Sequence, residues 1–541
     1  MITETLKGAD FIALVRSGAA QLGTDKKAVN DLNVFPIPDG DTGDNMYMTI
    51  TSGCDAVIGV PDLGDAAATL SQGMLLGARG NSGVILSRIF AGISKGLEGL
   101  SEADIRAFGE ALRRGVEESY KAVSVPVEGT MLTVYREAVE AANSTISEDT
   151  TFESYGTTFL GEMEASLERT PELLDVLKKA GVIDSGGAGL VSIVRGIMRA
   201  VTEGVTASPV AQASSPAKVN LNSFTEDSEL EFGYCTEFLL RLQRSKVDPE
   251  TFDENTVRDY LATMGDSIVC FKDGSIIKVH VHTLRPGDVL SHCQRWGEFL
   301  TLKIENMTLQ HHETTIRDGF SKVTRRYGIV TVASGEGLMA TLKEAGADKV
   351  ISGGQTMNPS VQSFLEAFDE VNASSIFVFP NNSNIILTAR QAASIYEKAS
   401  VHVIPSKTFG EGYAAIASFD SEIQDDKAQE DMLLEVMQGV VTGMISTAIR
   451  DAENGVNAGD FVGFVHGEIL FSSPSREEAV LGLCSKMDAG SRDVVLVFRG
   501  LAVSPEEAAR AEESLAKAFP MTEFIFQNGG QPVYDYIIIL T

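Results

Sequence analysis

An acidic loop at residues 33–45 (NVFPIPDGDTGDN) carries the side chains with the clearest capacity for chemistry in this sequence. Its prolines remove backbone donors and its glycines permit turns, so the segment predicts a loop rather than a helix interior or a buried strand. Asp39, Asp41 and Asp44 crowd this loop, and carboxylates held so close repel one another unless a cation lies between them. Mg²⁺ prefers oxygen ligands and commonly joins carboxylates to phosphates. A solvated turn is the alternative, which a short DGD motif favours when it is read alone.

Two glycine-rich loops also precede helical patterns. Residues 77–83 (GARGNSG) come before an apolar-periodic run at 84–93, and residues 184–189 (DSGGAG) come before another at 190–201. A glycine-rich loop that opens a helix offers free backbone N–H groups and the positive end of the helix dipole to an anion. Either loop alone is explained more simply as a tight connection between helices. Together with the acidic loop, they predict a nucleotide–Mg²⁺ site in one helical region.

The elements that must position these loops are helices. Apolar residues recur at spacings of three and four through residues 1–206, which predicts an all-α domain of seven or eight helices. Ser101 followed by Asp104 indicates the start of one of them, over 105–123. Residues 207–227 are small, polar and interrupted by proline, so they predict a linker to the next domain.

Four motifs in order carry a family resemblance: NVFPIPDGDTGDNM, LGARGNSGVILSRIF, EGTMLTVYREA and DSGGAGL. Together they resemble the nucleotide-binding L subunit of dihydroxyacetone kinases. The full-length arrangement is more similar still to the catalytic subunit of bacterial fatty acid kinases, and this resemblance covers essentially the whole chain. It implies that the helical region is an all-helical barrel, which binds ATP at one end through Mg²⁺ held by the acidic loop.

The resemblance implies roles for individual residues. Asp39 and Asp41 would be the Mg²⁺ ligands. Asn33 is a further candidate ligand, although its spacing differs by one residue from the family's pattern. Asp44 is another, although a neutral residue is expected there and Asp44 could equally face solvent. Arg79 is a candidate catalytic residue that would stabilise the transferred charge, with helix capping or pairing with an acidic neighbour as alternatives.

The remaining residues implied to surround the nucleotide lie in the glycine-rich loops and at the start of a helix: Gly80, Asn81, Ser82, Gly83, Thr130, Met131, Asp184, Gly186 and Gly187. The sequence contains no GxxxxGK[S/T] motif. In P-loop kinases, the lysine of that motif helps Mg²⁺ to neutralise the charge of the phosphates. Here Mg²⁺ would have to neutralise that charge without such a lysine.

Length, charge and cysteine usage limit the partners of this chain. Its 541 residues predict three or four domains, and its formal net charge of −31 disfavours nucleic acid and anionic membrane surfaces as partners. Five scattered cysteines are typical of a reducing cytoplasm. No apolar run approaches the length of a membrane span, so a lipid substrate would have to arrive on a carrier or be extracted by the protein.

A second domain is predicted over residues 228–320. Its pattern gives the order strand, helix, strand, strand, helix, strand over 237–242, 252–264, 267–271, 276–282, 286–294 and 299–304. This order is typical of a ferredoxin-like α+β unit, in which the third strand lies between the first two and runs antiparallel to the first.

That topology would bring one cysteine and two histidines together. His280 and His282 stand two apart on a strand and would share a face, and Cys235 lies just before the first strand of the unit. A thiolate and two imidazoles supply three of the four ligands of a Zn²⁺ ion, with water or another residue as the fourth. Histidines on half-exposed strands are common without a metal, so the spacing alone leaves the site open. The fatty acid kinase resemblance implies a zinc at these residues, in a structural or a catalytic role.

A third domain, predicted over 321–541, alternates strands with helices. Buried strands at 328–332, 349–351, 376–379 and 401–404 indicate a parallel α/β lobe over about 326–425. A long helix over 427–453 would lead to a second lobe over about 455–541. The two-lobed arrangement resembles DegV-type fatty-acid-binding proteins.

Small polar segments follow the strands of the first lobe at 333–337, 352–356, 380–384 and 405–408. Because open parallel sheets bind ligands at the carboxyl ends of their strands, these segments predict a ligand-binding or partner-binding edge. Ordinary loop chemistry explains them equally well. Residues 409–412 (FGEG) depart from the DegV-like sequence expected there, which weakens the transfer of a lipid-contact role.

The resemblance implies a cytoplasmic fatty acid kinase that acts in phospholipid metabolism. It would transfer the γ-phosphoryl group of ATP to the carboxylate of a fatty acid presented by a separate DegV-type fatty-acid-binding protein, giving an acyl phosphate. A carboxylate is already a nucleophile at neutral pH, so no strong general base is needed. The alternatives are a dihydroxyacetone-type kinase of small molecules and a non-catalytic, lipid-binding regulatory protein. The middle domain is a candidate site for homodimer formation.

Overall fold

The computed structural model describes residues 5–33, 40–59, 62–123, 125–203, 234–249, 251–273, 275–306, 325–354, 357–448, 451 and 455–541. The chain forms two compact units: residues 1–211 together with 325–541, and residues 212–324. The linker predicted over 207–227 lies outside the described residues. Among the helices described, none is both long enough and apolar enough to cross a membrane.

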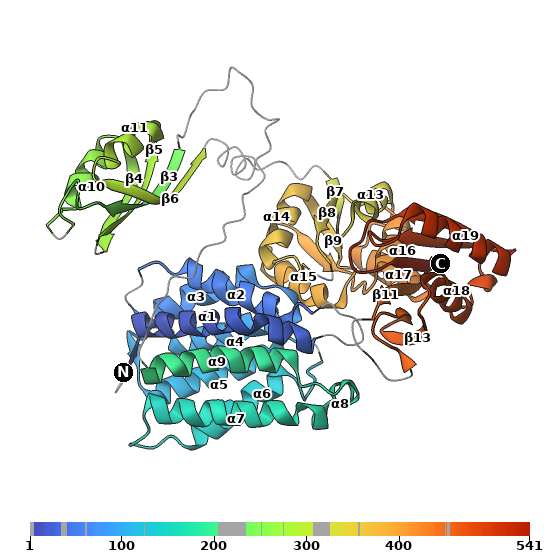
Figure 1. The fold of residues 1–541 in the computed structure, drawn as a ribbon, viewed down its shortest axis with the longest axis horizontal. Coiled ribbons are helices and arrows are strands. Elements are labelled where there is room, and N and C mark those ends of the chain that lie inside the picture. Colours follow the sequence, from blue (N-terminus) through green and yellow to red (C-terminus); the bar gives the residue numbers. More distant parts are fainter. Residues whose placement is uncertain are drawn as a thin grey trace. The chain divides into compact units, whose positions relative to one another are not determined.

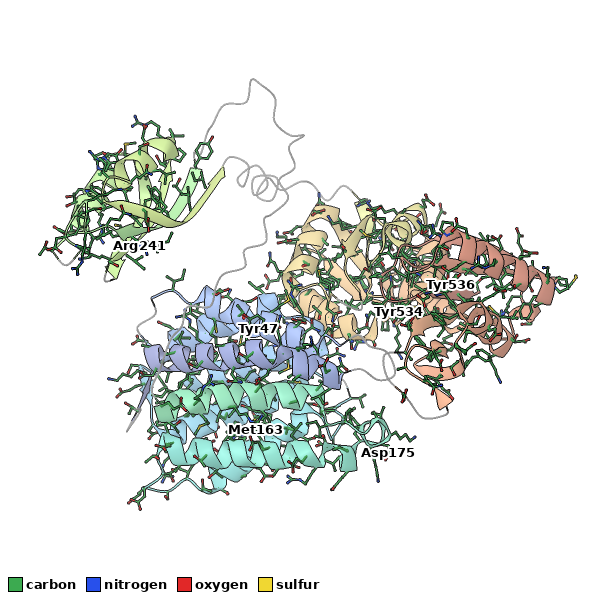
Figure 2. All side chains as sticks on the ribbon, in the orientation of Figure 1. Tyr47, Met163, Asp175, Arg241, Tyr534 and Tyr536 are labelled. Carbon is green, nitrogen blue, oxygen red and sulfur yellow. The ribbon has the colours of Figure 1, made fainter. Side chains whose placement is uncertain are left out.

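The amino-terminal domain is helical, as its apolar periodicity predicts. Its described residues form nine helices: α1 (Gly8–Leu32), α2 (Thr42–Ala56), α3 (Leu63–Gly77), α4 (Gly80–Leu97), α5 (Ile105–Lys121), α6 (Met131–Ser144), α7 (Phe152–Leu173), α8 (Asp175–Ala180) and α9 (Ser185–Glu203). Two short strands, β1 (Leu6–Lys7) and β2 (Glu102–Ala103), pair antiparallel. Figure 1 shows α1, α9 and α7 lying side by side along their length. Met163, labelled on this domain in Figure 2, is fully buried in their shared apolar core.

Local chemistry sets where these helices begin and end. Asp104 accepts a hydrogen bond from the backbone N–H of Ala107 at 2.8 Å, so it is the residue that caps the start of α5. The helix count exceeds the prediction because Leu174 takes an extended backbone and separates the short α8 from α7. Gly181, at a φ of +64°, then ends α8 in the left-handed conformation typical of a helix carboxyl end.

The middle unit is a four-stranded antiparallel sheet with two helices. Its elements are β3 (Tyr234–Leu242), α10 (Asn255–Ala262), β4 (Gly265–Asp273), β5 (Ile276–Thr283), α11 (Pro286–Cys293) and β6 (Gly297–Asn306). The strand order is β4-β5-β3-β6, and β5 runs antiparallel to β3. The third strand of the unit therefore lies between the first and the second, as the element order predicts.

The carboxyl-terminal domain holds two sheets. The first is parallel, in the order β10-β9-β7-β8, and the second is mixed, in the order β13-β12-β11-β16-β14-β15. The elements of the first sheet are β7 (Arg325–Ala333), α13 (Glu336–Glu344), β8 (Lys349–Ser352), α14 (Val361–Val371), β9 (Ala373–Phe379), α15 (Ser383–Ile395) and β10 (Ser400–Val403). The rest of the domain comprises α16 (Phe409–Ala417), α17 (Asp426–Gln438), β11 (Val441–Thr447), β12 (Phe461–Val465), β13 (Glu468–Ser473), α18 (Arg476–Lys486), a short 3₁₀ helix (Ala489–Ser491), β14 (Val494–Arg499), α19 (Pro505–Ala518), β15 (Glu523–Asn528) and β16 (Tyr536–Leu540). Tyr536, labelled in Figure 2, lies buried in β16.

The long helix predicted over 427–453 is wrong. Helix α17 ends at Gln438, and Val441–Thr447 form strand β11, which pairs with β12 on one side and β16 on the other. Gly439 follows the helix, and the β-branched residues after it pack better on a sheet than in a helix. The second sheet therefore begins before residue 455, where the second lobe was predicted to start.

Candidate functional site

The amino termini of three helices meet at one end of the helical domain. The hydroxyls of Ser185, at the start of α9, and Thr42, at the start of α2, lie 3.2 Å apart. The start of α4 lies against α2 as well, since a Cβ built on Gly80 would be 2.7 Å from Nδ2 of Asn45. Helix amino termini carry partial positive charge, so their convergence makes a site suited to an anion such as a phosphate.

A fourth helix, α6, contacts this end of the domain through Asp184. Its Oδ2 accepts a hydrogen bond from the backbone N–H of Gly187 at 2.7 Å, and the backbone N–H of Met131 also donates to its carboxylate. Burial raises the pKa of Asp184 to about 6, although the two backbone donors lower it. A Cβ on Gly186 would lie 3.0 Å from Sδ of Met131. The loop before α9 and the start of α6 are therefore in contact, as expected for residues that surround one nucleotide.

Asp41 is one of the two acidic-loop carboxylates that the structure describes. It is the residue before α2, only 6% of its surface is exposed, and its Oδ2 accepts a hydrogen bond of 2.6 Å from Nδ2 of Asn358. Asp39 lies outside the described residues. The carbonyl of Asn33 accepts the N–H of Gly40 at 3.1 Å, so the two ends of the acidic loop are held together beside Asp41.

Asp44 has partners on helix α1. Nζ of Lys26 and Nδ2 of Asn30 each lie 2.7 Å from one of its carboxylate oxygens. Partial burial disfavours the charged form, but the hydrogen bonds from Lys26 and Asn30 outweigh it and hold the pKa of Asp44 below its ordinary value. Asp44 therefore fastens α1 to α2, a role that the sequence alone did not indicate.

The glycine-rich loop before α4 needs its glycines. Gly80 has a φ of +56°, which side chains rarely adopt, and a Cβ on Gly83 would lie 2.5 Å from Oγ1 of Thr49. The neighbouring Asn81 and Ser82 are half-buried. These two glycines therefore let the start of α4 pack closely against Asn45 and Thr49 of α2.

Arg79 and Asn81 reach into the carboxyl-terminal domain. Nη1 of Arg79 donates to the backbone carbonyl of Asn358 at 2.9 Å, and Nδ2 of Asn81 lies 3.4 Å from Oδ1 of Asn384. Burial lowers the pKa of Arg79, whose partner is a carbonyl rather than an acidic side chain. Thr130, the residue before α6, is likewise half-buried at this end of the domain.

Asn358 is the site residue that the sequence did not predict. The segments after the first-lobe strands were expected to gather at one sheet edge, and 352–356 was among them, but Asn358 lies beyond it. Its partner Asp41 is 317 positions away in the chain. Short-range patterns of polarity and periodicity carry no signal for a contact over that separation.

The strand-end segments of the first lobe do converge. They line a pocket that is open to solvent, together with residues of the second sheet. The segments contribute Ser334, Gly353, Gly354, Asn381, Asn382 and Thr408, and the second lobe contributes Met444, Gln531 and Tyr534 among others. Phe409, from the segment that departs from the DegV-like sequence, also lines it.

The backbone of the middle unit brings the predicted zinc residues near one another. Cys235 pairs with His282 across β3 and β5, and His280 pairs with Glu237. The side chains of Cys235, His280 and His282 lie outside the described part of the structure. Among the described side chains, no group of three or more histidines, cysteines or acidic residues could hold a metal ion. Zinc therefore stays a prediction.

Comparison with known proteins identifies three matching family models. The DAK2 domain matches residues 36–199, the middle domain of FakA-like fatty acid kinases matches 231–314, and their carboxyl-terminal domain matches 328–540. Protein YloV from Bacillus subtilis (strain 168) is 40% identical over 555 residues, which cover 99% of this chain and all of that protein.

Two solved structures are similar to parts of the chain. The crystal structure of DegV, a fatty acid binding protein from Bacillus subtilis, is 12% identical with a TM-score of 0.30, over 40% of this chain and 98% of that one. The dihydroxyacetone kinase from C. freundii in complex with AMP-PNP and Mg²⁺ is 19% identical with a TM-score of 0.29, over 35% of this chain and 33% of that one. The three family models in order, and the full-length similarity to YloV, show that the chain belongs to the FakA-like fatty acid kinase family, whose amino-terminal DAK2 domain indicates a kinase.

Proposed function

We propose that this protein transfers the γ-phosphoryl group of ATP to the carboxylate of a fatty acid, which a separate DegV-type fatty-acid-binding protein presents. The product would be an acyl phosphate. The observation that carries the proposal is the buried Asp41 at a junction of helix amino termini, in a chain of the FakA-like fatty acid kinase family. Such a junction attracts phosphate, and a buried carboxylate within it favours a cation nearby.

The residues at this junction fit Mg²⁺. Asp41 offers a carboxylate with little access to water, and Asn358, 2% exposed, has a side-chain Oδ1 that accepts no hydrogen bond from any described residue. Oxygen atoms of these kinds are what Mg²⁺ binds. Asp41 would hold the ion together with Asp39, and Asn33 remains a further candidate. Bound there, Mg²⁺ would neutralise charge on the phosphates of ATP during transfer.

The chain's own groups would bind and orient the nucleotide. The N–H groups of Gly80, Asn81 and Ser82, at the start of α4, would donate to phosphate oxygens, because the first N–H groups of a helix have no acceptor within it. The N–H of Gly83 donates to the carbonyl of Arg79 at 3.1 Å. Asp184 keeps the loop before α9 in contact with Met131, and these residues would form the opposite wall of the nucleotide site. Arg79, held by the carbonyl of Asn358, would contribute positive charge at the rim of the site.

We assign the parts of the chain as follows: a kinase domain over 1–206 built as an all-helical barrel, a linker over 207–227, a ferredoxin-like middle domain over 228–320 and a DegV-like domain over 321–541. The middle domain would bind Zn²⁺ through Cys235, His280 and His282 and would be the site of homodimer formation. The antiparallel pairing of Cys235 with His282 supports a zinc site, since it brings their backbones alongside each other.

The experiment that tests the function is ATP consumption with a DegV-type protein loaded with fatty acid, compared with mixtures that lack either component. Turnover in the complete mixture alone is expected. Asp39→Ala and Asp41→Ala should each abolish it, while Asp55→Ala, an exposed residue near the other end of α2, should not.

Three outcomes would contradict the proposal. Activity near wild type in both aspartate variants would refute the metal assignment. Turnover with dihydroxyacetone but not with the loaded carrier would favour a small-molecule kinase. Lipid binding without any ATP turnover would favour a regulatory protein.

A further inference from the structure

The carboxyl-terminal domain contributes one buried side chain to the end of the helical domain where the helices converge. Asn358 is 2% exposed, and its Nδ2 donates to Oδ2 of Asp41 at 2.6 Å. Its backbone carbonyl accepts from Nη1 of Arg79 at 2.9 Å, and its Nδ2 would be 3.0 Å from a Cβ on Gly80. One residue thus contacts the acidic loop, the arginine and the glycine-rich loop at once.

The segment that carries Asn358 is firmly attached to the helical domain. The backbone N–H of Val361 donates to the carbonyl of Ala78 at 3.2 Å, and Arg79 and Ser360 form an isolated antiparallel bridge. Ala78 and Val84 belong to the same apolar core as Val361 and the first sheet. Because this core is continuous across the two domains, the position of Asn358 is fixed by packing as well as by hydrogen bonds.

In the contact between Asn358 and Asp41, an uncharged amide donates a hydrogen bond to a carboxylate. A lysine or arginine at this position would neutralise Asp41 and remove the reason for a cation to bind. An amide N–H instead orients Oδ2 and does not itself neutralise the charge of Asp41. The Oδ1 of Asn358, which no described residue engages, adds a second oxygen beside Asp41.

We propose that Asn358 is a positioning residue for Mg²⁺-nucleotide binding, supplied by the carboxyl-terminal domain to the helical domain. This inference rests on the proposed function, because it takes Asp41 as a ligand of Mg²⁺. It makes the carboxyl-terminal domain part of the nucleotide site. Loss of the amide would remove the donor that orients Oδ2 of Asp41 and would weaken the binding of Mg²⁺ with nucleotide.

The test is calorimetric titration of the full-length protein with Mg²⁺ and AMP-PNP, which measures binding without turnover. Asn358→Ala should weaken Mg²⁺-dependent AMP-PNP binding about tenfold, the size expected for losing one hydrogen bond to a charged group. Binding of AMP-PNP without Mg²⁺ should be unchanged. In turnover assays with the loaded carrier protein, the variant should recover toward the wild-type kcat as Mg²⁺ is raised, since its defect lies in binding.

Gln391→Ala is the matched control. Gln391 is buried at the same domain contact, where Arg88 of α4 donates to its side chain, but it is not in contact with Asp41. If Asn358 only held the domains together, Gln391→Ala would weaken Mg²⁺ binding to a similar degree, which would overturn the proposal. Asn358→Leu, which keeps the number of heavy side-chain atoms and lacks the donor, should behave as Asn358→Ala and separates loss of the donor from loss of packing.

Asp41→Asn separates failure of this inference from failure of the proposed function. Unchanged Mg²⁺ dependence in Asp41→Asn would refute the metal assignment itself. Lost Mg²⁺ dependence in Asp41→Asn with wild-type binding in Asn358→Ala would refute the inference alone. Tighter Mg²⁺ binding in Asn358→Ala would also refute it, because the amide would then compete with the ion.

Discussion

The buried carboxyl of Asp184 should make the stability of the helical domain depend on pH in a window that the sequence does not reveal. Burial raises its pKa in the folded protein from 3.8 to about 6. Between these two values the folded protein holds a proton on Asp184 while the unfolded chain does not. The free energy of unfolding therefore falls as the pH rises through this window, and the loss persists above it.

The size of the effect follows from the two pKa values. They differ by about 2.2, and each pKa unit corresponds to about 1.4 kcal/mol, which gives about 3 kcal/mol. The residue keeps some exposed surface, so solvent screening reduces the expected loss to between about 1.5 and 3 kcal/mol. Asp184→Asn keeps an oxygen for the N–H of Gly187 and cannot ionise, so this contribution should be absent from the variant.

The assay is urea unfolding of both proteins from pH 4 to pH 7, followed by circular dichroism at 222 nm. The single tryptophan, Trp296, belongs to the middle unit, so its fluorescence would not report on the helical domain. Relative to wild type, Asp184→Asn should gain stability as the pH rises from about 4 to about 6 and no more above it. Parallel pH curves for the two proteins would refute the assignment of a raised pKa to Asp184.

Three further predictions concern the same domain. Gly83→Ala should destabilise the protein by about 1–3 kcal/mol, measured by urea unfolding, because the added Cβ would collide with Thr49. It should also weaken AMP-PNP binding, and a stability equal to that of the wild type would contradict the collision. Gly161→Ala, in α7 with no atom near the added Cβ, is its control and should stabilise the protein by up to about 1 kcal/mol. Lys26→Ala should raise the pKa of Asp44, measured by NMR titration of the carboxyl carbon, and should cost about 0.5 kcal/mol because both side chains are partly exposed; an unshifted pKa would contradict the ion pair.

Much of the architecture was predictable because periodicity reflects local physics. Apolar spacing located the helices of the first domain, and strand alternation gave the order of the middle unit. The error over 427–453 arose where a short apolar strand, β11, followed a helix directly. Short apolar runs suit either element, and pairing with β12 and β16 decided the outcome here.

The candidate site was predictable to the extent that its residues act locally. Gly80, Gly83 and Asp184 could be proposed because their glycine-rich loops precede helical patterns and because their motifs resemble those of the family. The partners of Asp44 and Asp41 were not found, since Lys26 lies on another helix and Asn358 in another domain. Such contacts depend on the packing of complete elements.

The separation between Asp41 and Asn358 has a consequence for how the protein is made. At about 5–20 residues per second, the ribosome needs between about 16 and 63 s to add the 317 positions that divide them. During that interval the emerging helical domain holds the carboxylate of Asp41 before the amide that covers it has been made. A nascent chain, or a fragment released early, would therefore lack the amide that contacts Asp41, and on our proposal its nucleotide binding would be weaker than that of the finished polypeptide.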